Sequence, residues 1–393
     1  MNRLILIALV VVSLQSKAQD SITSFWLGRS VGKLPALADG LGDDRLGGAK
    51  LGYLDTNIVL KVIDSVNNLY QVQLSKYHTA YIEKGFVKRD SSIVEKPFYL
   101  TQSWQVMGSD SSYDILSIRL DQKLPYKSWM EINPSKIMLD IYGVQSNTNW
   151  ITQLTSLKEI KNIYYNQVED DVVRVTIELK HVQHWGYSLG YTGKMLVMKI
   201  KRQPEKLNIK YIKVAIDAGH GGTNLGAEGK RSKAIEKEYT LVFAKALQHK
   251  LKRKKVEVIM TRSTDTTFDL KDRILFLQQQ NPDLLISLHL NANDNTNANG
   301  ASTYYKHIGF RPVSQTILKR MLDIKMNEFG NVGNFNFTLN APTDFVNTLL
   351  EIGFLSNAED ELRITDPRFP AKVAKQVAKG IKDWLLLCKN LKQ

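Results

Sequence analysis

The sequence predicts an α/β C-terminal catalytic domain with a mostly parallel sheet flanked by helices, preceded by two all-β domains. From residue 211 onward, short apolar runs of strand length alternate with longer stretches whose apolar residues recur at helical spacing. Before residue 201, the patterned segments alternate apolar and polar residues, as half-buried strands do. A length of 393 residues fits two or three domains.

The chain begins with a pattern typical of a secretory signal peptide. Arg3 precedes an apolar run over residues 4–14, and the small residues Ser16 and Ala18 follow it. We therefore expect a signal peptide over residues 1–18 and an exported protein, either periplasmic or secreted. A permanent membrane anchor is the alternative, but the run is shorter than the roughly 20 residues that cross a bilayer. No transmembrane anchor is expected after cleavage.

The charge and the cysteine content restrict the partners. The formal net charge of +14 favours acidic partners such as anionic wall polymers or a membrane surface. Nucleic acid is not expected, because the lysines are spread over the whole length and no recognition motif is present. Cys388 is the only cysteine, so an intramolecular disulfide is excluded. We expect it to be an inert residue on an apolar helix face.

Two β-rich stretches precede the C-terminal domain. Residues 22–94 contain short strand-like runs, such as 70–74, separated by glycine and aspartate turns, which predicts a small β-barrel. Residues 97–201 contain longer alternating runs, at 115–120, 137–142 and 172–179, which indicates a β-sandwich. Residues 202–210 are charged, include Pro204 and are predicted to form a linker.

Residues 211–388 alternate between strand and helix patterns. The expected strands cover residues 211–217, 256–261, 284–290 and 345–350, and the expected helices cover residues 236–251, 274–280, 314–328 and 370–387. Strands of open α/β sheets present functional residues at their carboxyl ends. His220 lies in a glycine-rich loop after the first strand, and His289 ends the strand at 284–290.

These two histidines suggest a metal site. A catalytic zinc site usually has three protein ligands and leaves a fourth position to water. Glu236 begins the helix after the glycine-rich loop and could reach back toward His220 as the third ligand. Each signal is weak by itself, because a lone histidine after a strand is more often structural and a glutamate in a first helical turn is usually stabilised by the helix dipole.

The order of the motifs strengthens this interpretation. The motifs, in chain order, are IDAGHGG (216–222), EKEYTL (236–241), TR (261–262), ISLHLNA (286–292) and LEIGFLSN (350–357). Through these motifs, residues 211–388 resemble the zinc-dependent N-acetylmuramoyl-L-alanine amidases. The resemblance implies Zn²⁺ bound by His220, Glu236 and His289, with Glu351 as the catalytic acid and base. Upstream, residues 97–201 resemble an AMIN domain and residues 22–94 a bacterial Src-homology-type barrel.

The implied function is a peptidoglycan hydrolase. It would cleave the amide bond between N-acetylmuramic acid and the L-alanine of the stem peptide, using zinc-activated water with glutamate as general acid and base. Glu351 could also be a surface residue at a strand end, but its apolar neighbours imply partial burial, which is costly for a carboxylate without a role. The alternatives are a zinc peptidase that cuts within the stem peptide and a non-catalytic wall-binding protein.

Three further residues are candidates for substrate binding. Arg262 and Arg273 could hold carboxylates or phosphates of the substrate, although surface pairing with Asp265 or Asp272 is the more ordinary explanation. Asn291 could orient His289 or bind the substrate.

Regulation is predicted from the length of one segment. Some periplasmic relatives carry a long inserted helix that plugs the site until an activator removes it. Residues 309–344 have room for one ordinary helix only, so we expect an open site that requires no activator.

Overall fold

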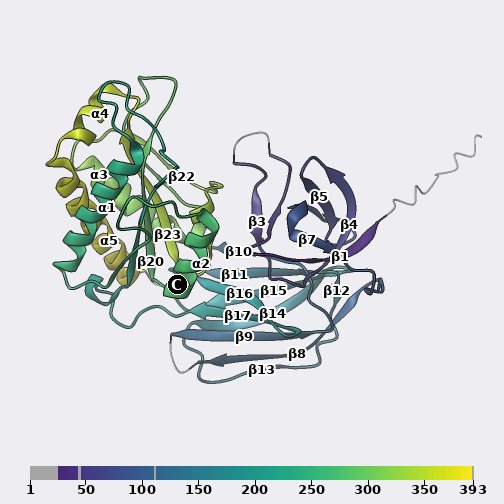
Figure 1. Ribbon diagram of the computed structural model, residues 1–393. Coiled ribbons are helices and arrows are strands. Elements are labelled where there is room, and N and C mark those ends of the chain that lie inside the picture. Colours follow the sequence, from purple (N-terminus) through teal and green to yellow (C-terminus); the bar gives the residue numbers. More distant parts are fainter. Residues whose placement is uncertain (1–24, 43–45, 110–111, 392–393) are drawn as a thin grey trace, which may run out of the picture.

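The computed structural model describes residues 25–42, 46–109 and 112–391. The described chain forms three successive parts, which comprise strands β1–β7, strands β8–β17, and the elements from β18 to α5 (Figure 1). The predicted signal peptide, residues 1–18, lies outside the described residues. A search of the described residues finds no helix that is long and apolar enough to cross a membrane.

The first part is one antiparallel sheet of seven strands in the order β3-β2-β6-β5-β4-β1-β7. Leu60, Val72 and Ile82 are among its buried core residues. The predicted strand at 70–74 corresponds to β5. The strands are β1 (Trp26–Ser30), β2 (Ala36–Ala38), β3 (Lys50–Tyr53), β4 (Val59–Val66), β5 (Leu69–Gln73), β6 (Thr79–Glu83) and β7 (Val87–Arg89), with a 3-10 turn at Lys84–Phe86.

The second part consists of two sheets, in the orders β10-β11-β15-β14 and β12-β8-β9-β17-β16, and β13 pairs with β8. The predicted runs at 115–120, 137–142 and 172–179 form β9, β11 and β15. The strands are β8 (Tyr99–Gly108), β9 (Tyr113–Leu120), β10 (Tyr126–Glu131), β11 (Lys136–Tyr142), β12 (Val144–Gln145), β13 (Ile151–Gln153), β14 (Ile160–Glu169), β15 (Val172–Leu179), β16 (Tyr187–Thr192) and β17 (Met195–Lys201).

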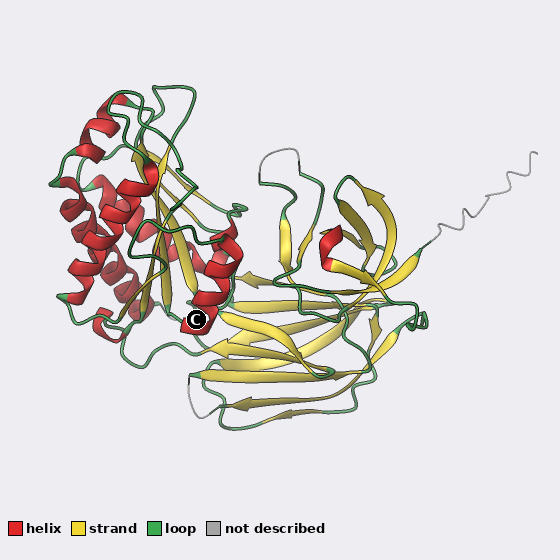
Figure 2. Ribbon diagram, viewed as in Figure 1, coloured by secondary structure: helices red, strands yellow, loops and turns green. Residues whose placement is uncertain are grey.

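The third part is a six-stranded sheet in the order β19-β18-β20-β23-β21-β22, with helices on both faces. Helices α1, α3 and α5 lie together on one side and α2 lies on the other (Figures 1 and 2). The strands are β18 (Val214–Ala218), β19 (Val258–Met260), β20 (Leu284–Asn291), β21 (Ala301–Tyr304), β22 (Glu328–Val332) and β23 (Val346–Phe354). The helices are α1 (Glu236–Lys252), α2 (Leu270–Gln280), α3 (Arg311–Leu322), α4 (Ala358–Thr365) and α5 (Phe369–Asn390), and 3-10 turns occur at Ile209–Tyr211, Ile308–Phe310 and Thr338–Asn340.

An α/β domain that follows an all-β region is therefore confirmed. The sheet of the α/β domain is mixed. Parallel pairs join β18 to β19 and β20, β20 to β23, and β21 to β22, whereas β21 runs antiparallel to β23. The helix predicted over 314–328 is wrong at its C-terminal end, because α3 ends at Leu322 and Glu328 begins β22.

The second and third parts pack closely against each other. The side-chain amide of Gln183 donates to the Gly309 carbonyl at 2.8 Å, and its oxygen accepts from the Trp384 indole at 2.9 Å. The Trp185 and Trp384 rings lie 5.0 Å apart. Lys201, the residue before the predicted linker, is buried and forms an ion pair with Asp283 at 2.9 Å. The predicted linker therefore follows a close-packed junction.

The first part also contacts the third. Leu34 and Tyr53 pack against an apolar cluster on the α2 face of the sheet. The Asn336 amide nitrogen donates to the Gly48 carbonyl at 2.9 Å, and its oxygen accepts from the Lys50 backbone at 3.1 Å. The segment between β22 and β23 is thereby attached to the loop that precedes β3.

Candidate metal centre

His220 lies just after β18. Its backbone φ of +62° is in a region that residues other than glycine rarely adopt. Its Nδ1 lies 2.8 Å from the Asn224 side-chain oxygen, which also accepts from the Gly226 backbone at 3.3 Å. An amide oxygen can only accept, so Nδ1 donates in this contact, and Nε2 is the ring nitrogen that faces Glu236. A second partner of this kind is typical of metal-binding histidines.

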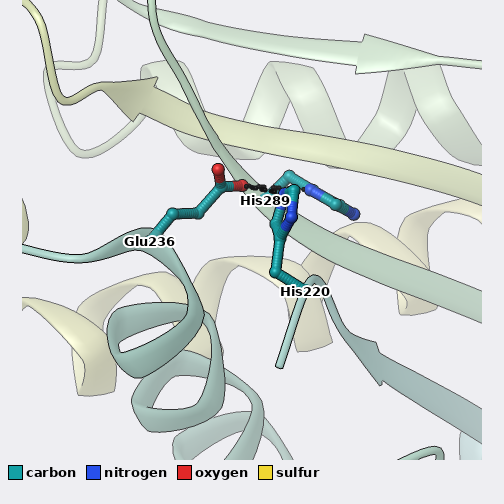
Figure 3. A group of neighbouring side chains, drawn as sticks. All are labelled: His220, Glu236 and His289. Carbon is teal, nitrogen blue, oxygen red and sulfur yellow. Dashed lines mark hydrogen bonds and ion pairs between the residues drawn. The ribbon is translucent and has the colours of Figure 1, made fainter. Parts of the chain in front are cut away.

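Glu236 joins the two histidines. It is the first residue of α1, and its Oε1 lies 3.1 Å from His220 Nε2 and 3.0 Å from His289 Nδ1 (Figure 3). The backbone amides of Leu290 and Ala227 donate to the two carboxylate oxygens at 3.0 and 2.8 Å. One nitrogen from each histidine and one Glu236 oxygen all lie within 4.8 Å of one another.

The three groups are electrostatically coupled. Burial by itself would raise the pKa of Glu236, but hydrogen bonds from His220 and His289 outweigh burial and hold it well below the usual value. Burial would likewise lower the pKa of His220, but the contact with Glu236 raises it. The carboxylate is therefore ionised at neutral pH, as a metal ligand must be.

Two glycines make room for these side chains. A Cβ at Gly219 would overlap the His289 ring, and a Cβ at Gly226 would overlap the Glu236 carboxylate. Gly226 also has a φ of +71°, in the region that favours glycine. The glycine-rich loop therefore serves close packing around the three side chains.

Arg262 and Arg273 lie beneath this loop and are almost fully buried. Arg262 donates to the carbonyls of Ala218 and Gly219, both at 2.9 Å. Arg273 donates to the His220 carbonyl at 2.6 Å and pairs with buried Asp217 at 2.8 Å. The interpretation as surface ion pairs is wrong, because both guanidinium groups point to groups inside the fold.

Asp265 and Asp272, the surface partners predicted for the two arginines, form ion pairs with lysines instead. Asp265 pairs with Lys237 at 2.7 Å, and Asp272 pairs with Lys33 at 3.4 Å. The contacts of Arg262 and Arg273 hold the backbone that carries His220 and point away from a substrate role.

Glu351 lies on β23 directly beside His289 of β20 in the parallel register. Register neighbours in adjacent strands project from the same face of a sheet, about 5 Å apart. Glu351 is 7% exposed, and its charge contributes to the raised pKa of Tyr304, for which burial is the larger cause. The Asn291 side-chain oxygen accepts from the Ala292 backbone at 2.8 Å, so its local role is to order the end of β20.

The three-residue cluster fits a divalent metal ion. Two imidazole nitrogens and one carboxylate form a donor set of the kind that catalytic zinc sites use. The cluster lies where β18 and β20 end and α1 begins, which is the usual place for a site in an open α/β sheet. Fold and site together define an α/β domain with a candidate metal centre at the carboxyl ends of its strands.

Comparisons with known proteins agree with this description. Residues 214–383 match the family model of N-acetylmuramoyl-L-alanine amidases, and residues 105–200 match that of the AMIN domain. The C-terminal part of the chain thus matches the N-acetylmuramoyl-L-alanine amidase domain, and an AMIN domain match precedes it. The resemblances to the amidases and to the AMIN domain are confirmed, and the Src-homology-type barrel over residues 22–94 stays a prediction.

Individual relatives match somewhat less than half of the chain. A probable cell wall amidase LytH of Staphylococcus epidermidis is 33% identical over 172 residues, which are 44% of this chain and 57% of that protein. The chain thus spans just over half the length of the curated relatives it matches.

Among solved structures, similarity extends to the catalytic domain of CwlV, an N-acetylmuramoyl-L-alanine amidase from Bacillus (Paenibacillus) polymyxa var. colistinus. It is 33% identical, and the match covers 44% of this chain and 98% of that one, with a TM-score of 0.43. An N-acetylmuramoyl-L-alanine amidase from Clostridium difficile 630 is 32% identical, with 44% and 96% covered and a TM-score of 0.43.

Two residues near the site were not anticipated from the sequence. Asn224 orients His220, and Tyr304 lies beside Glu351. The spacing of four residues between His220 and Asn224 within a glycine-rich loop was a usable signal. No sequence signal marks Tyr304, because it is brought close to Glu351 by the antiparallel pairing of β21 with β23.

Proposed function

We propose that this protein is a zinc-dependent peptidoglycan amidase that cleaves the bond between N-acetylmuramic acid and the L-alanine of the stem peptide. The observation that carries the proposal is the cluster of His220, Glu236 and His289 within the amidase-family match, with Glu351 in register beside it. The family match supplies the reaction class, and the cluster supplies a place for the metal.

Each residue has a chemical task in this proposal. His220, Glu236 and His289 would hold Zn²⁺, which when bound activates water and polarises an amide carbonyl. Glu351 would accept a proton from the attacking water and deliver it to the departing amine nitrogen. Its buried position next to His289 suits a carboxylate that must lie near the metal ligands without being one of them.

The same proposal assigns the domains. Residues 22–94 would form the Src-homology-like barrel, 97–201 the AMIN-like module, 202–210 the connection and 211–388 the catalytic domain, after a signal peptide over 1–18. Export to the periplasm or exterior accords with the AMIN match and with the cell wall amidase relatives.

Mass spectrometry of digested peptidoglycan tests the reaction. Purified sacculi are incubated with the wild-type chain, with Glu351→Gln, with Glu236→Gln and with a chelator-treated sample. Free stem peptides that begin with L-alanine are expected from the wild type only, and re-addition of Zn²⁺ should restore them in the chelated sample. Glu238→Gln is the matched control, because Glu238 is exposed on the same helix turn as Glu236.

Other products would overturn the proposal. Fragments cut inside the stem peptide would establish a peptidase, and the absence of any metal-dependent product would establish a wall-binding protein. Equal activity of Glu351→Gln and wild type would remove Glu351 from its role.

We further propose that the two β-rich parts hold the enzyme on the wall, which would raise the local substrate concentration. The Glu351→Gln variant is used because it should bind the sacculi without cleaving them. It should sediment with purified sacculi. If it stays in the supernatant at physiological salt, wall tethering is wrong.

We infer that no activator is required. The segment 309–344 contains one helix of ordinary length, α3, whose buried residues Val313 and Ile317 belong to the main hydrophobic core. His289 and Glu351 lie in strands whose other face packs against that core. The purified chain alone should therefore digest sacculi, whereas a requirement for an added protein would contradict this inference.

A further inference from the structure

A cavity of about 440 Å³ lies where the three parts of the chain meet. The first part contributes Lys50 and Leu51, the second contributes Trp129 on β10, and the third contributes Tyr305 and Lys306, which follow β21. In Figure 1, β10 passes below the space between β3 and the α/β domain. The volume falls within the range of small-molecule sites.

Three lysines line this cavity, one from each part of the chain. Lys306 Nζ lies 3.4 Å from the side-chain oxygen of Asn336, and Lys50 Nζ lies 3.4 Å from the backbone oxygen of the same residue. Lys127 Nζ lies 6.0 Å from the centroid of the Trp129 ring. Among the described residues that line the cavity, Asp39 is the one acidic residue, and it is exposed.

The arrangement leaves positive charge concentrated in a partly desolvated place. Burial, with a smaller contribution from the nearby charge of Lys50, lowers the pKa of Lys306 to about 8. Burial also lowers the pKa of Lys50, although Glu83 opposes the effect. Two ammonium groups that share a neutral partner gain stability when an anion enters between them.

We propose that this cavity binds an oxyanion, the carboxylate or phosphate group of an acidic wall component, and that the bound anion bridges all three parts of the chain. Lysine ammonium groups bind both kinds of oxyanion as point charges. The rings of Trp129 and Tyr305 offer apolar surface to the remainder of the ligand. This site is separate from the candidate metal centre and does not depend on the proposed amidase reaction.

Calorimetric titration of the full chain tests the proposal. The probes are inorganic phosphate and the dicarboxylate glutarate, each added at constant ionic strength. Lys306→Met and Lys50→Met should each weaken binding of the preferred probe by about tenfold or more, because each removes one charge-assisted contact with the anion. Lys88→Met is the matched control, since Lys88 is an exposed residue of the same first part and lies outside the cavity.

The two probes distinguish the sources of the anion. Tighter binding of phosphate would support a phosphate-bearing polymer, and tighter binding of glutarate would support the carboxylates of a peptide. No saturable binding of either probe, or equal weakening by Lys88→Met, overturns the proposal.

A conservative variant separates charge from folding. Lys306→Arg keeps the positive charge and should retain binding within about threefold, which is a small difference in free energy. If Lys306→Arg loses as much affinity as Lys306→Met while its thermal unfolding matches the wild type, the lysine charge is not what binds the anion and the proposal fails.

Discussion

At the scale of single residues, the candidate centre depends on partners that carry no charge. Asn224 accepts from Nδ1 of His220, and so holds the ring with Nε2 facing Glu236. Gly219 leaves the space that the His289 ring occupies. Both residues act through the ligands rather than as ligands.

Asn224→Ala should weaken zinc binding about 10- to 100-fold, the usual effect of removing a partner that orients a metal-binding histidine. Competition with a fluorescent zinc chelator measures the affinity. Asn297→Ala, at an exposed position in the loop after β20, is the control and should bind as the wild type does. An unchanged affinity in Asn224→Ala would show that His220 is oriented by other contacts.

Gly219→Ala should abolish zinc binding at micromolar zinc while leaving the chain folded, because the added methyl group displaces the His289 ring at the protein surface rather than in the main core. Zinc content after dialysis and circular dichroism together test this expectation. Gly85→Ala, whose added Cβ meets no atom within 4 Å, should change neither quantity. Full zinc occupancy of Gly219→Ala would contradict the crowding argument.

At the scale of elements, the loop from β18 to α1 is held from below by charged groups that are fully inside the fold. Asp217 accepts from Thr261 and Ser287 at 2.7 and 2.6 Å and pairs with Arg273. Burial would raise the pKa of Asp217, but the charge of Arg273, together with the charge of His289 and the hydrogen bonds from Ser287 and Thr261, lowers it. The pair contributes stability at neutral pH that is lost as pH falls below the unfolded value of about 3.9 and through the lower folded value.

Arg273→Met should destabilise the third part by about 3–5 kcal/mol, because it leaves the Asp217 carboxylate buried without its cation. Urea unfolding followed by tryptophan fluorescence gives the change. Arg320→Met, which removes partly exposed pairs with Asp323 and Asp383, should cost far less. Similar losses in the two variants would refute the buried-pair explanation.

The attachment of the first part to the segment before β23 depends on Asn336. Asn336→Ala removes its contacts with the Gly48 carbonyl and the Lys50 backbone, and should increase hydrogen exchange about tenfold in residues 46–50 and 333–337. Asn166→Ala, exposed on β14, is the control. Unchanged exchange in these segments would mean that the apolar contacts of Leu34 and Tyr53 suffice.

These elements also show how far the sequence could predict the structure. Helix α1 was predicted to within one residue of its end, because Leu241, Ala244, Leu247 and Leu251 recur at helical spacing. The short strands β21 and β22 lack a clear alternation, and their positions depend on pairing with distant strands. Arg262 and Arg273 were misinterpreted because their partners are backbone carbonyls and a distant aspartate, which leave no local pattern.

At the scale of the whole molecule, the AMIN domain and the C-terminal domain meet in a buried junction that contains Trp185 and Trp384. His184 is buried there, with its Nε2 2.9 Å from the Glu131 carbonyl, and Gly309 lies against its ring. Burial lowers the pKa of His184 to about 4, although the contact with the Glu131 carbonyl opposes the effect. The neutral ring is therefore the form that the junction accommodates.

Acidification should weaken this junction. An unfolded histidine binds a proton near pH 6.5 whereas folded His184 does so near pH 4, so its contribution to stability is complete above pH 6.5 and falls as pH drops toward 4, by about 3 kcal/mol. Urea unfolding at several pH values should show a shallower decline for His184→Gln than for wild type. His249→Gln, exposed on α1, should follow the wild type, and identical slopes in all three would disprove the role of His184.

Cys388 lies in the same junction, and its reactivity reports when the junction opens. This single thiol is buried on α5, lies 3.8 Å from the Gln183 side-chain oxygen, and has its pKa raised to about 12 by burial. A thiol reagent can modify it only during moments when α5 and the AMIN domain separate or α5 unfolds. The rate of that modification therefore measures how often the junction opens. It can be measured in the unaltered protein, because no probe has to be attached.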